Sequence, residues 1–148
     1  MSAEKVVIVD IDGTIADNTH RLHHINADTP DWPAFYEAMK DDKTINSIVD
    51  LVYELWTGGF RVVLLTGRPE EYRKLTEDWL EREQIVFDDL IMRPTNSYVE
   101  DTQIKSQLLR ESGIATSSIK FILEDRKRIV DMWRKKGFTV LHVAEGNY

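Results

Sequence analysis

The chain has 148 residues, 42% hydrophobic and 30% charged, so it is long enough to bury a core of ordinary globular composition. It contains no cysteine, which excludes disulfides and thiolate metal sites, and no apolar run approaches the ~20 residues that span a bilayer. A net charge of −7 argues against a broad electrostatic footprint on nucleic acid but leaves room for a small basic site. We expect one domain over residues 1–148, located in the cytoplasm, because residues 1–5 do not open a signal peptide.

Five apolar runs rich in β-branched residues indicate strands that are buried on both faces. In chain order they are residues 6–9, 61–65, 87–92, 119–123 and 139–143. Helical patterns lie between the later runs, at residues 45–56, 69–83, 104–112 and 128–136. This alternation predicts an α/β fold, a doubly wound five-stranded parallel sheet with right-handed crossovers.

The polar side chains that follow these runs suggest the order of the strands. Carboxylates follow the first and fourth runs and a hydroxyl follows the second, so we place the first strand between the second and the fourth. The predicted order is 3-2-1-4-5, and ligands of such sheets bind beyond the carboxyl ends of the strands, where the order reverses.

Residues 17–44 interrupt the alternation with a polar stretch that holds one expected short helix, near residues 32–39. A stretch of this length can form a flap and a minimal cap but not a large cap domain, so we expect an open site. Three histidines without a matching cysteine or distant histidine are predicted to lie on the flap surface: His20, His23 and His24. Four tryptophans are expected to pack in the core or on helix faces rather than to stack on bases: Trp32, Trp56, Trp79 and Trp133.

Asp10 and Asp12 stand where the first strand ends and the chain turns through Gly13. One carboxylate can attack phosphorus while the other protonates the leaving oxygen and later takes a proton from water. We expect the neighbouring carboxylate to raise the pKa of Asp12, which would make its acid form available near neutral pH. The alternative is a pair of turn-forming aspartates, since Asp-Gly is common in turns.

Thr66 and Gly67 follow the second strand, where a hydroxyl and backbone N–H groups can bind a phosphoryl oxygen. A helix beginning near Pro69 would add the positive end of its dipole. Arg68 could form a bidentate contact with a phosphate. The alternative is a simple strand-to-helix turn with an exposed arginine.

Lys105 lies near the start of a helical pattern and could neutralise Asp10 and a phosphate together. Its alternative partner is Asp101, four residues earlier on a helix surface. Glu124 and Asp125 follow the fourth strand, where adjacent carboxylates suit Mg²⁺, although Asp125 could instead cap a helix. Together these groups predict phosphoryl-transfer chemistry at one edge of the sheet.

The four pieces resemble the four motifs of the haloacid dehalogenase superfamily of phosphohydrolases. They are Asp10-Ile-Asp12-Gly13-Thr14, Thr66-Gly67-Arg68, Lys105 and Glu124-Asp125. The resemblance implies an aspartyl-phosphate on Asp10 and a Mg²⁺ ion held by Asp10, the backbone carbonyl of Asp12 and Asp125. Glu124 stands where many relatives have aspartate, which leaves open whether it or Asp125 reaches the metal directly.

The chain is also similar to the 3′-phosphatase domain of phage polynucleotide kinase/phosphatase, through residues 125–137 and 143–148. Further residues keep the spacing of that domain: Arg21, Arg68, Arg93, Asp101 and Lys105. The resemblance implies that Arg21 and Arg68 help to hold the substrate phosphate, and we predict that both lie on exposed loops. We also expect Arg93 and Asp101 to bind substrate and Lys105 to act in catalysis. A kinase half is missing, because the sequence has no Gly-rich loop with Lys-Ser/Thr for a nucleoside triphosphate.

We therefore interpret the chain as a Mg²⁺-dependent phosphomonoesterase that removes 3′-phosphates from polynucleotide ends. The substrate would be a phosphorylated nucleic-acid end or a nucleotide, with a separate kinase or ligase as a possible partner and no membrane association. A general nucleotide or sugar-phosphate phosphatase is the enzymatic alternative. A phospho-receiver signalling domain is the alternative from another class, but a receiver usually carries its accepting aspartate after the third strand.

Overall fold

A computed structural model of the protein describes residues 3–146. Its central sheet has five parallel strands in the order β5-β4-β1-β6-β7. These strands are β1 (Val6–Val9), β4 (Arg61–Pro69), β5 (Asp89–Arg93), β6 (Ile119–Arg126) and β7 (Val140–Gly146). In sequence order of the five strands this arrangement is 3-2-1-4-5, so the predicted sheet and strand order are confirmed.

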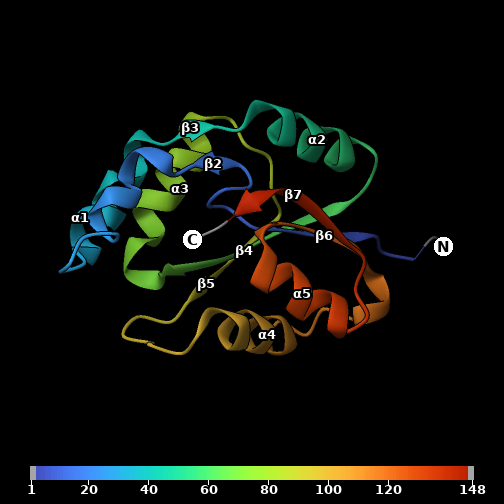
Figure 1. The fold of residues 1–148 in the computed structure, drawn as a ribbon. Helices are drawn as coiled ribbons and strands as arrows, with labels where there is room; N and C mark the ends of the chain where they lie inside the picture. The colour runs from blue at the N-terminus through green and yellow to red at the C-terminus, as the bar shows by residue number, and fades with distance from the viewer. Residues whose placement is uncertain (1–2, 147–148) are drawn as a thin grey trace.

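Helices cover both faces of the sheet (Figure 1). One face carries α2 (Asn46–Thr57) and α3 (Arg73–Arg82), and the other carries α4 (Asp101–Glu111) and α5 (Lys127–Lys135). The short 3₁₀ helices η3 (Glu70–Tyr72) and η4 (Thr116–Ser118) lie at connections. The four helices agree with the predicted ones within a few residues at each end.

The central strand β1 shows why both faces are covered. Val6 and Ile8 belong to the apolar cluster under α4 and α5, which also contains Trp133. Val7 and Val9 belong to the cluster under α2 and α3, which contains Trp79. Since side chains alternate between the two faces of a strand, a continuous apolar run is what a doubly covered strand requires.

Strands β4, β6 and β7 end three or four residues later than the sequence pattern indicated. β4 runs to Pro69 with a register break between Thr66 and Pro69, and β6 runs to Arg126 with a break after Glu124. The helix that we expected near Pro69 instead begins at Arg73, after η3, so no α-helix starts beside Thr66. The site residues carried by β4 and β6 therefore belong to irregular strand ends.

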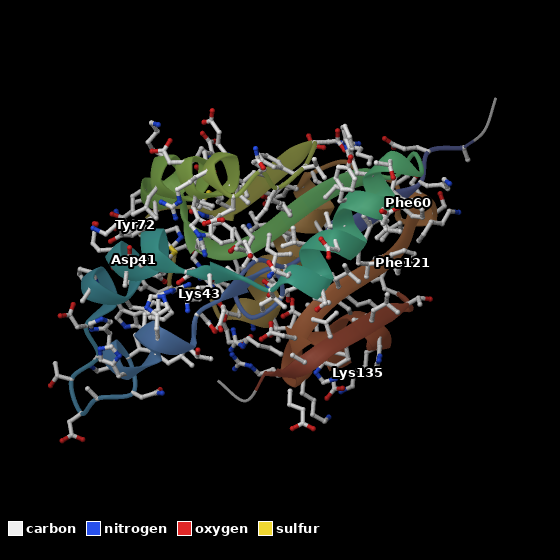
Figure 2. All side chains as sticks on the ribbon, turned by 90° about the horizontal axis from the view of Figure 1, so that it is seen from above. Asp41, Lys43, Phe60, Tyr72, Phe121 and Lys135 are labelled. Carbon is white, nitrogen blue, oxygen red and sulfur yellow. The ribbon has the colours of Figure 1, made fainter. Side chains whose placement is uncertain are left out.

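The insertion, residues 17–44, forms several short elements beyond the carboxyl edge of the sheet, at the end toward which β7 points (Figure 1). It contains η1 (Thr19–His24), α1 (Trp32–Glu37) and η2 (Ala38–Asp41). The short strands β2 (Ala16–Asp17) and β3 (Lys43–Thr44) pair antiparallel where it leaves and rejoins the sheet. Seen from above, Asp41, Lys43 and Tyr72 lie at this end of the molecule and the ring pair Phe60–Phe121 at the other (Figure 2).

The tryptophans divide into two classes. Trp79 and Trp133 are buried, as predicted for core residues, whereas Trp32 and Trp56 are 48% and 42% exposed. Trp32 on α1 and Trp56 on α2 instead lie on helix faces, each against a tyrosine ring of its own helix. None of the helices in the described part of the chain has the length and apolar character of a membrane span.

Candidate active site

The carboxylate of Asp10 lies at the end of β1 and is held on both oxygens. Lys105 Nζ donates to Asp10 Oδ1 at 2.8 Å, and Thr14 Oγ1 donates to Asp10 Oδ2 at 3.0 Å. Thr14 reaches back because Gly13, at a φ of +83°, turns the chain directly after the strand. All three side chains are buried, so the orientation of Asp10 is fixed by local turn geometry and by α4.

Three buried carboxylates gather at this point, from Asp10, Glu124 and Asp125, with one oxygen of each within 4.8 Å of the others. Lys105 Nζ also donates to Glu124 Oε2 at 2.9 Å and is the ammonium that bridges two of them. Three carboxylates and one ammonium leave an excess of negative charge. Hard oxygen ligands with such an excess suit Mg²⁺, so these residues fit the predicted metal.

The pKa values of Asp10, Glu124 and Lys105 reflect the same excess of negative charge. Burial, and next the charge of Glu124, raise the pKa of Asp10 well above its ordinary value, although Lys105 acts in the opposite direction. Burial also raises the pKa of Glu124. For Lys105 burial alone would lower the pKa, but Asp10 and Glu124 outweigh it and raise the pKa. The ammonium is therefore held charged between the two carboxylates.

The wall behind Asp125 is the last strand, β7. His142 Nε2 lies 2.8 Å from the backbone oxygen of Asp125, and a side chain at Gly146 would place its Cβ 2.6 Å from Asp125 Oδ2. The α5 helix begins with Arg126 at its N-cap and has no side-chain cap, so Asp125 does not act as the alternative N-cap. Its carboxylate is instead buried beside Asp10 and Glu124.

Asp12 faces two guanidinium groups rather than the carboxylate cluster. Arg21 Nη2 donates to Asp12 Oδ1 at 2.5 Å, and Arg68 donates to both oxygens, from Nη2 at 2.7 Å and from Nε at 3.1 Å. Arg21 and Arg68 are both fully buried. The expectation that they lie on exposed loops is therefore wrong, because the insertion covers the strand ends and encloses them.

The expected direction of the Asp12 pKa is also wrong. Burial would raise the pKa, but the charges of Arg68 and Arg21 outweigh burial and hold the pKa of Asp12 below its ordinary range. With both arginines in place, Asp12 is a carboxylate rather than an acid. The neighbouring carboxylate that we considered, Asp10, is paired with Lys105 instead.

Asp42 is a site residue that the sequence reasoning missed. Its buried carboxylate accepts from Arg21 Nε at 2.8 Å and Nη2 at 2.9 Å, and Arg68 Nη2 lies 3.4 Å away. The insertion histidine His20 also contacts it, with Nε2 at 2.7 Å from Oδ1. Asp42 directly precedes β3 at the end of the insertion, and no local motif marked it.

Thr66 and Gly67 lie at the break in β4. Thr66 Oγ1 accepts from the Arg68 N–H at 3.1 Å, which shapes the turn that carries Arg68. The Gly67 carbonyl accepts from Arg93 Nε at 3.1 Å, and a Cβ on Gly67 would lie 3.5 Å from Asp101 Oδ1. Thr66 and Gly67 therefore each contact one of the three arginines predicted to bind substrate, Arg68 and Arg93 respectively.

Arg93 and Asp101 form a second ion-pair group at the edge of the site. Arg93 donates to the Val99 carbonyl at 2.5 Å and pairs with Asp101, which also pairs with Arg126. Burial would raise the pKa of Asp101, but Arg126 and Arg93 lower it. Arg126 was not among the predicted residues, and it follows Glu124-Asp125 directly in sequence. Asp101 begins α4 and does not serve as the surface partner of Lys105.

Comparison with known proteins identifies the family of the chain. A family model described as the polynucleotide kinase PNKP phosphatase domain matches residues 4–148. Chains in two solved structures, the Pnkp1/Rnl/Hen1 complex and the Pnkp1/Rnl/Hen1 RNA repair complex, are each 32% identical to this one, with TM-scores of 0.82 and 0.81. The matches cover 99% and 100% of this chain but 47% and 45% of those chains, so the protein spans about half their length.

A haloacid dehalogenase-like hydrolase from Streptococcus pneumoniae is similar in fold, at 16% identity and a TM-score of 0.64. That match covers 95% of this chain and 84% of the other. The resemblance drawn from the sequence motifs is confirmed, although its last residues, 147 and 148, lie outside the described part of the chain. The protein belongs to the family of polynucleotide kinase phosphatase domains, within the haloacid dehalogenase-like phosphohydrolases.

Proposed function

We propose that the protein is a Mg²⁺-dependent phosphomonoesterase that removes 3′-phosphates from polynucleotide ends, with Asp10 as the nucleophile. The observation that carries this proposal is the restraint of Asp10. Its two oxygens accept from Lys105 and Thr14, and two further carboxylates lie beside it. A buried carboxylate fixed in one orientation beside a metal-binding group is suited to attack phosphorus.

Asp10, Glu124 and Asp125 would hold the Mg²⁺ ion, together with the backbone carbonyl of Asp12. Bound there, the ion would offset the excess negative charge and polarise the phosphoryl group. Lys105 keeps its ammonium between Asp10 and Glu124, so the charge on Asp10 remains balanced while phosphate approaches. Glu124 is already occupied by Lys105, which favours Asp125 as the more direct ligand.

The chemistry would proceed in two displacements. In the first, an oxygen of Asp10 bonds to phosphorus as the ester P–O bond breaks, and the leaving 3′ oxygen takes a proton from Asp12 to become a hydroxyl. In the second, Asp12 takes a proton from water, whose oxygen bonds to phosphorus and releases inorganic phosphate and the free Asp10 carboxylate.

The first displacement requires protonated Asp12, yet its two arginines hold it ionised. A substrate phosphate offers Arg21 and Arg68 a doubly charged partner with the same bidentate geometry. As the guanidinium groups turn to the phosphate, Asp12 loses the charges that lower its pKa and can then carry the proton. Substrate binding and preparation of the acid would thus be one event.

The polynucleotide substrate is supported by the family and by the architecture of the insertion. We propose that residues 17–44 act as a flap that brings Arg21 over the strand ends, while Arg93 and Asp101 border the side through which a nucleic-acid end enters. The similar chains belong to structures of the Pnkp1/Rnl/Hen1 complex, one of which is described as an RNA repair complex. That description supports a nucleic-acid end as substrate and RNA repair proteins as partners.

The test is a panel of identical oligonucleotides phosphorylated at the 3′ or the 5′ end, as DNA and as RNA, with and without Mg²⁺. We expect release of phosphate from 3′ ends, abolished by chelation and restored by Mg²⁺. Equal rates at both ends, or preference for sugar phosphates, would contradict the polynucleotide assignment.

A further inference from the structure

A set of stacked aromatic rings lies on the outer side of the insertion. The Trp32 and Tyr36 rings on α1 are 5.9 Å apart at 28°, and Tyr36 lies 4.8 Å from Tyr72 at 34°. We call Trp32, Tyr36 and Tyr72 the aromatic platform. Trp32 is 48% exposed, and the ring contacts connect it through Tyr36 to Tyr72, which Figure 2 labels.

The platform is connected to the candidate active site through Phe35. The Phe35 ring lies edge-on to Trp32 and carries the Arg21 guanidinium at 4.4 Å from its centroid. Arg21 in turn donates to Asp12. A single short helix therefore holds both the exposed ring of Trp32 and the ring that supports a predicted phosphate-binding arginine.

The pKa of Tyr36 is affected by charges of the candidate active site. Burial, and next the charge of Asp12, raise the pKa of Tyr36 to about 12. Its hydroxyl is therefore neutral at physiological pH and does not repel a phosphate. Asp12 itself keeps 22% of its side chain exposed, so the site opens to solvent near the rings.

We infer that the aromatic platform stacks on the nucleobase next to the phosphate that is removed. This inference rests on the proposed function and adds a specificity element to it. Stacking tolerates any base, because every base has a π-face, and it typically contributes tenfold or more to affinity. A sugar phosphate has no such face and would lose this contribution.

The charge of the protein strengthens the argument. With a net charge of −7, the chain gains little long-range attraction for a polyanion. Contacts that do not depend on charge must then hold the nucleoside, and stacked rings provide them. Arg21 and Arg68 are buried and paired with Asp12 and Asp42. We therefore assign them to the single phosphate and not to the nucleoside.

The test compares a 3′-phosphorylated oligonucleotide with the same oligonucleotide ending in a 3′-phosphorylated abasic residue. Binding is measured with Asp10→Asn protein, so that a failure of turnover does not affect the result. We expect the base to strengthen binding by roughly tenfold. Trp32→Ala should remove that preference and leave binding of the abasic end unchanged, and Trp32→Phe should restore part of it.

Trp56→Ala is the matched control. Trp56 is also an exposed tryptophan with a tyrosine neighbour, Tyr53 at 6.4 Å, but it lies at the end of α2 that leads into the start of β4. Trp56→Ala should change the binding of neither oligonucleotide. Unfolding temperatures of each variant check that α1 remains folded.

Binding measurements test the aromatic platform, and turnover measurements test the 3′-phosphatase assignment. Equal affinity of the parent protein for base-bearing and abasic ends would overturn the platform. An equal loss of affinity for both ends in Trp32→Ala would also overturn it. A surface that binds a protein partner would give these results. Loss of the 3′-end preference in turnover, with base-dependent binding retained, would instead refute the 3′-phosphatase assignment and leave the platform standing as a nucleotide subsite.

Discussion

The carboxylate of Asp42 holds Arg21 in place, accepting from Nε at 2.8 Å and from Nη2 at 2.9 Å. Both side chains are buried, and the same Nη2 also donates to Asp12 Oδ1. The arginine that is proposed to bind phosphate is therefore positioned by a residue that need not touch the phosphate. Several consequences of this charged interior can be measured.

Asp42→Asn should lower the free energy of unfolding by about 3 kcal/mol, because it removes one of the two carboxylates that balance the buried charges of Arg21 and Arg68. Denaturant unfolding measures the change. Asp28→Asn, at an exposed position of the same insertion, should change stability by less than about 0.5 kcal/mol. Equal effects of the two substitutions would show that Asp42 contributes no special stability.

Arg21→Ala and Arg68→Ala should now reduce stability as well as turnover, in contrast to the effect of removing an exposed loop arginine. Each removes a buried cation that contacts Asp12 and leaves that carboxylate with one partner fewer. Arg128→Ala is the control, since Arg128 is 55% exposed and pairs with Glu100 on the surface. Unchanged melting temperatures for both buried variants would contradict the enclosed site.

Asp10→Asn should retain the fold and lose essentially all ester hydrolysis, because an amide is a poor nucleophile. Asp12→Asn should slow turnover by roughly 10²–10⁴-fold through loss of general acid and base catalysis. It should also strengthen binding of inorganic phosphate, since Arg21 and Arg68 no longer have the Asp12 charge as a competitor. Calorimetric titration with phosphate measures this gain, and weaker binding would argue against the competition.

Mg²⁺ should stabilise the protein, by about 2.7 kcal/mol at a concentration one hundred times its dissociation constant. The folded-state pKa values of Asp10 and Glu124 are raised, so the folded protein binds these protons more tightly than the unfolded chain. This contribution to metal-free stability is therefore lost as the pH rises from about 4 through the raised folded pKa values. Mg²⁺ should reduce that loss.

Asp125→Asn provides the matched variant for this experiment. It removes one of three buried carboxylates, so we expect the metal-free protein to become more stable at neutral pH and its response to Mg²⁺ to disappear. Thermal unfolding at several pH values, with Mg²⁺ or with chelator, measures both effects. A Mg²⁺ response that survives the substitution would place the metal elsewhere.

Gly146→Ala should weaken Mg²⁺ binding. Its new Cβ would lie 2.6 Å from Asp125 Oδ2 and 2.8 Å from the Asp125 backbone, so the carboxylate must move. Gly58→Ala is a suitable control, because its Cβ would meet backbone oxygens no closer than 3.3 Å at a φ of −78°. Equal Mg²⁺ affinities in both variants would show that β7 does not constrain the site.

The sheet could be predicted from the sequence because each strand corresponds to a short run of mainly apolar residues. Val6–Val9 is apolar on both faces, and the carboxylates and hydroxyl that follow the strands indicated the order of the central three. The predicted site residues could be assigned for the same reason, since the carboxyl ends of parallel strands meet at one edge. Their catalytic roles stay predictions.

The environment of Asp12 could not be predicted in this way. It depends on how the insertion folds back, which brings Arg21 and Asp42 against Arg68 from β4, and such contacts leave no periodic signal in the sequence. The local rule of adjacent carboxylates gave the wrong sign for the Asp12 pKa, because two guanidinium groups from distant segments dominate it. The exposure of Trp32 could not be predicted for a related reason. A short helix has too few turns to reveal which of its faces is exposed to solvent.

The groups around Asp10 are carried by strands of the sheet, by the turn after β1 and by α4, whereas Arg21, Asp42, Trp32 and Tyr36 all come from the insertion. Under the proposed function, one continuous stretch of the chain would select the nucleic-acid end, while the strands would carry the reaction. Grafting residues 17–44 between family members should then transfer substrate preference.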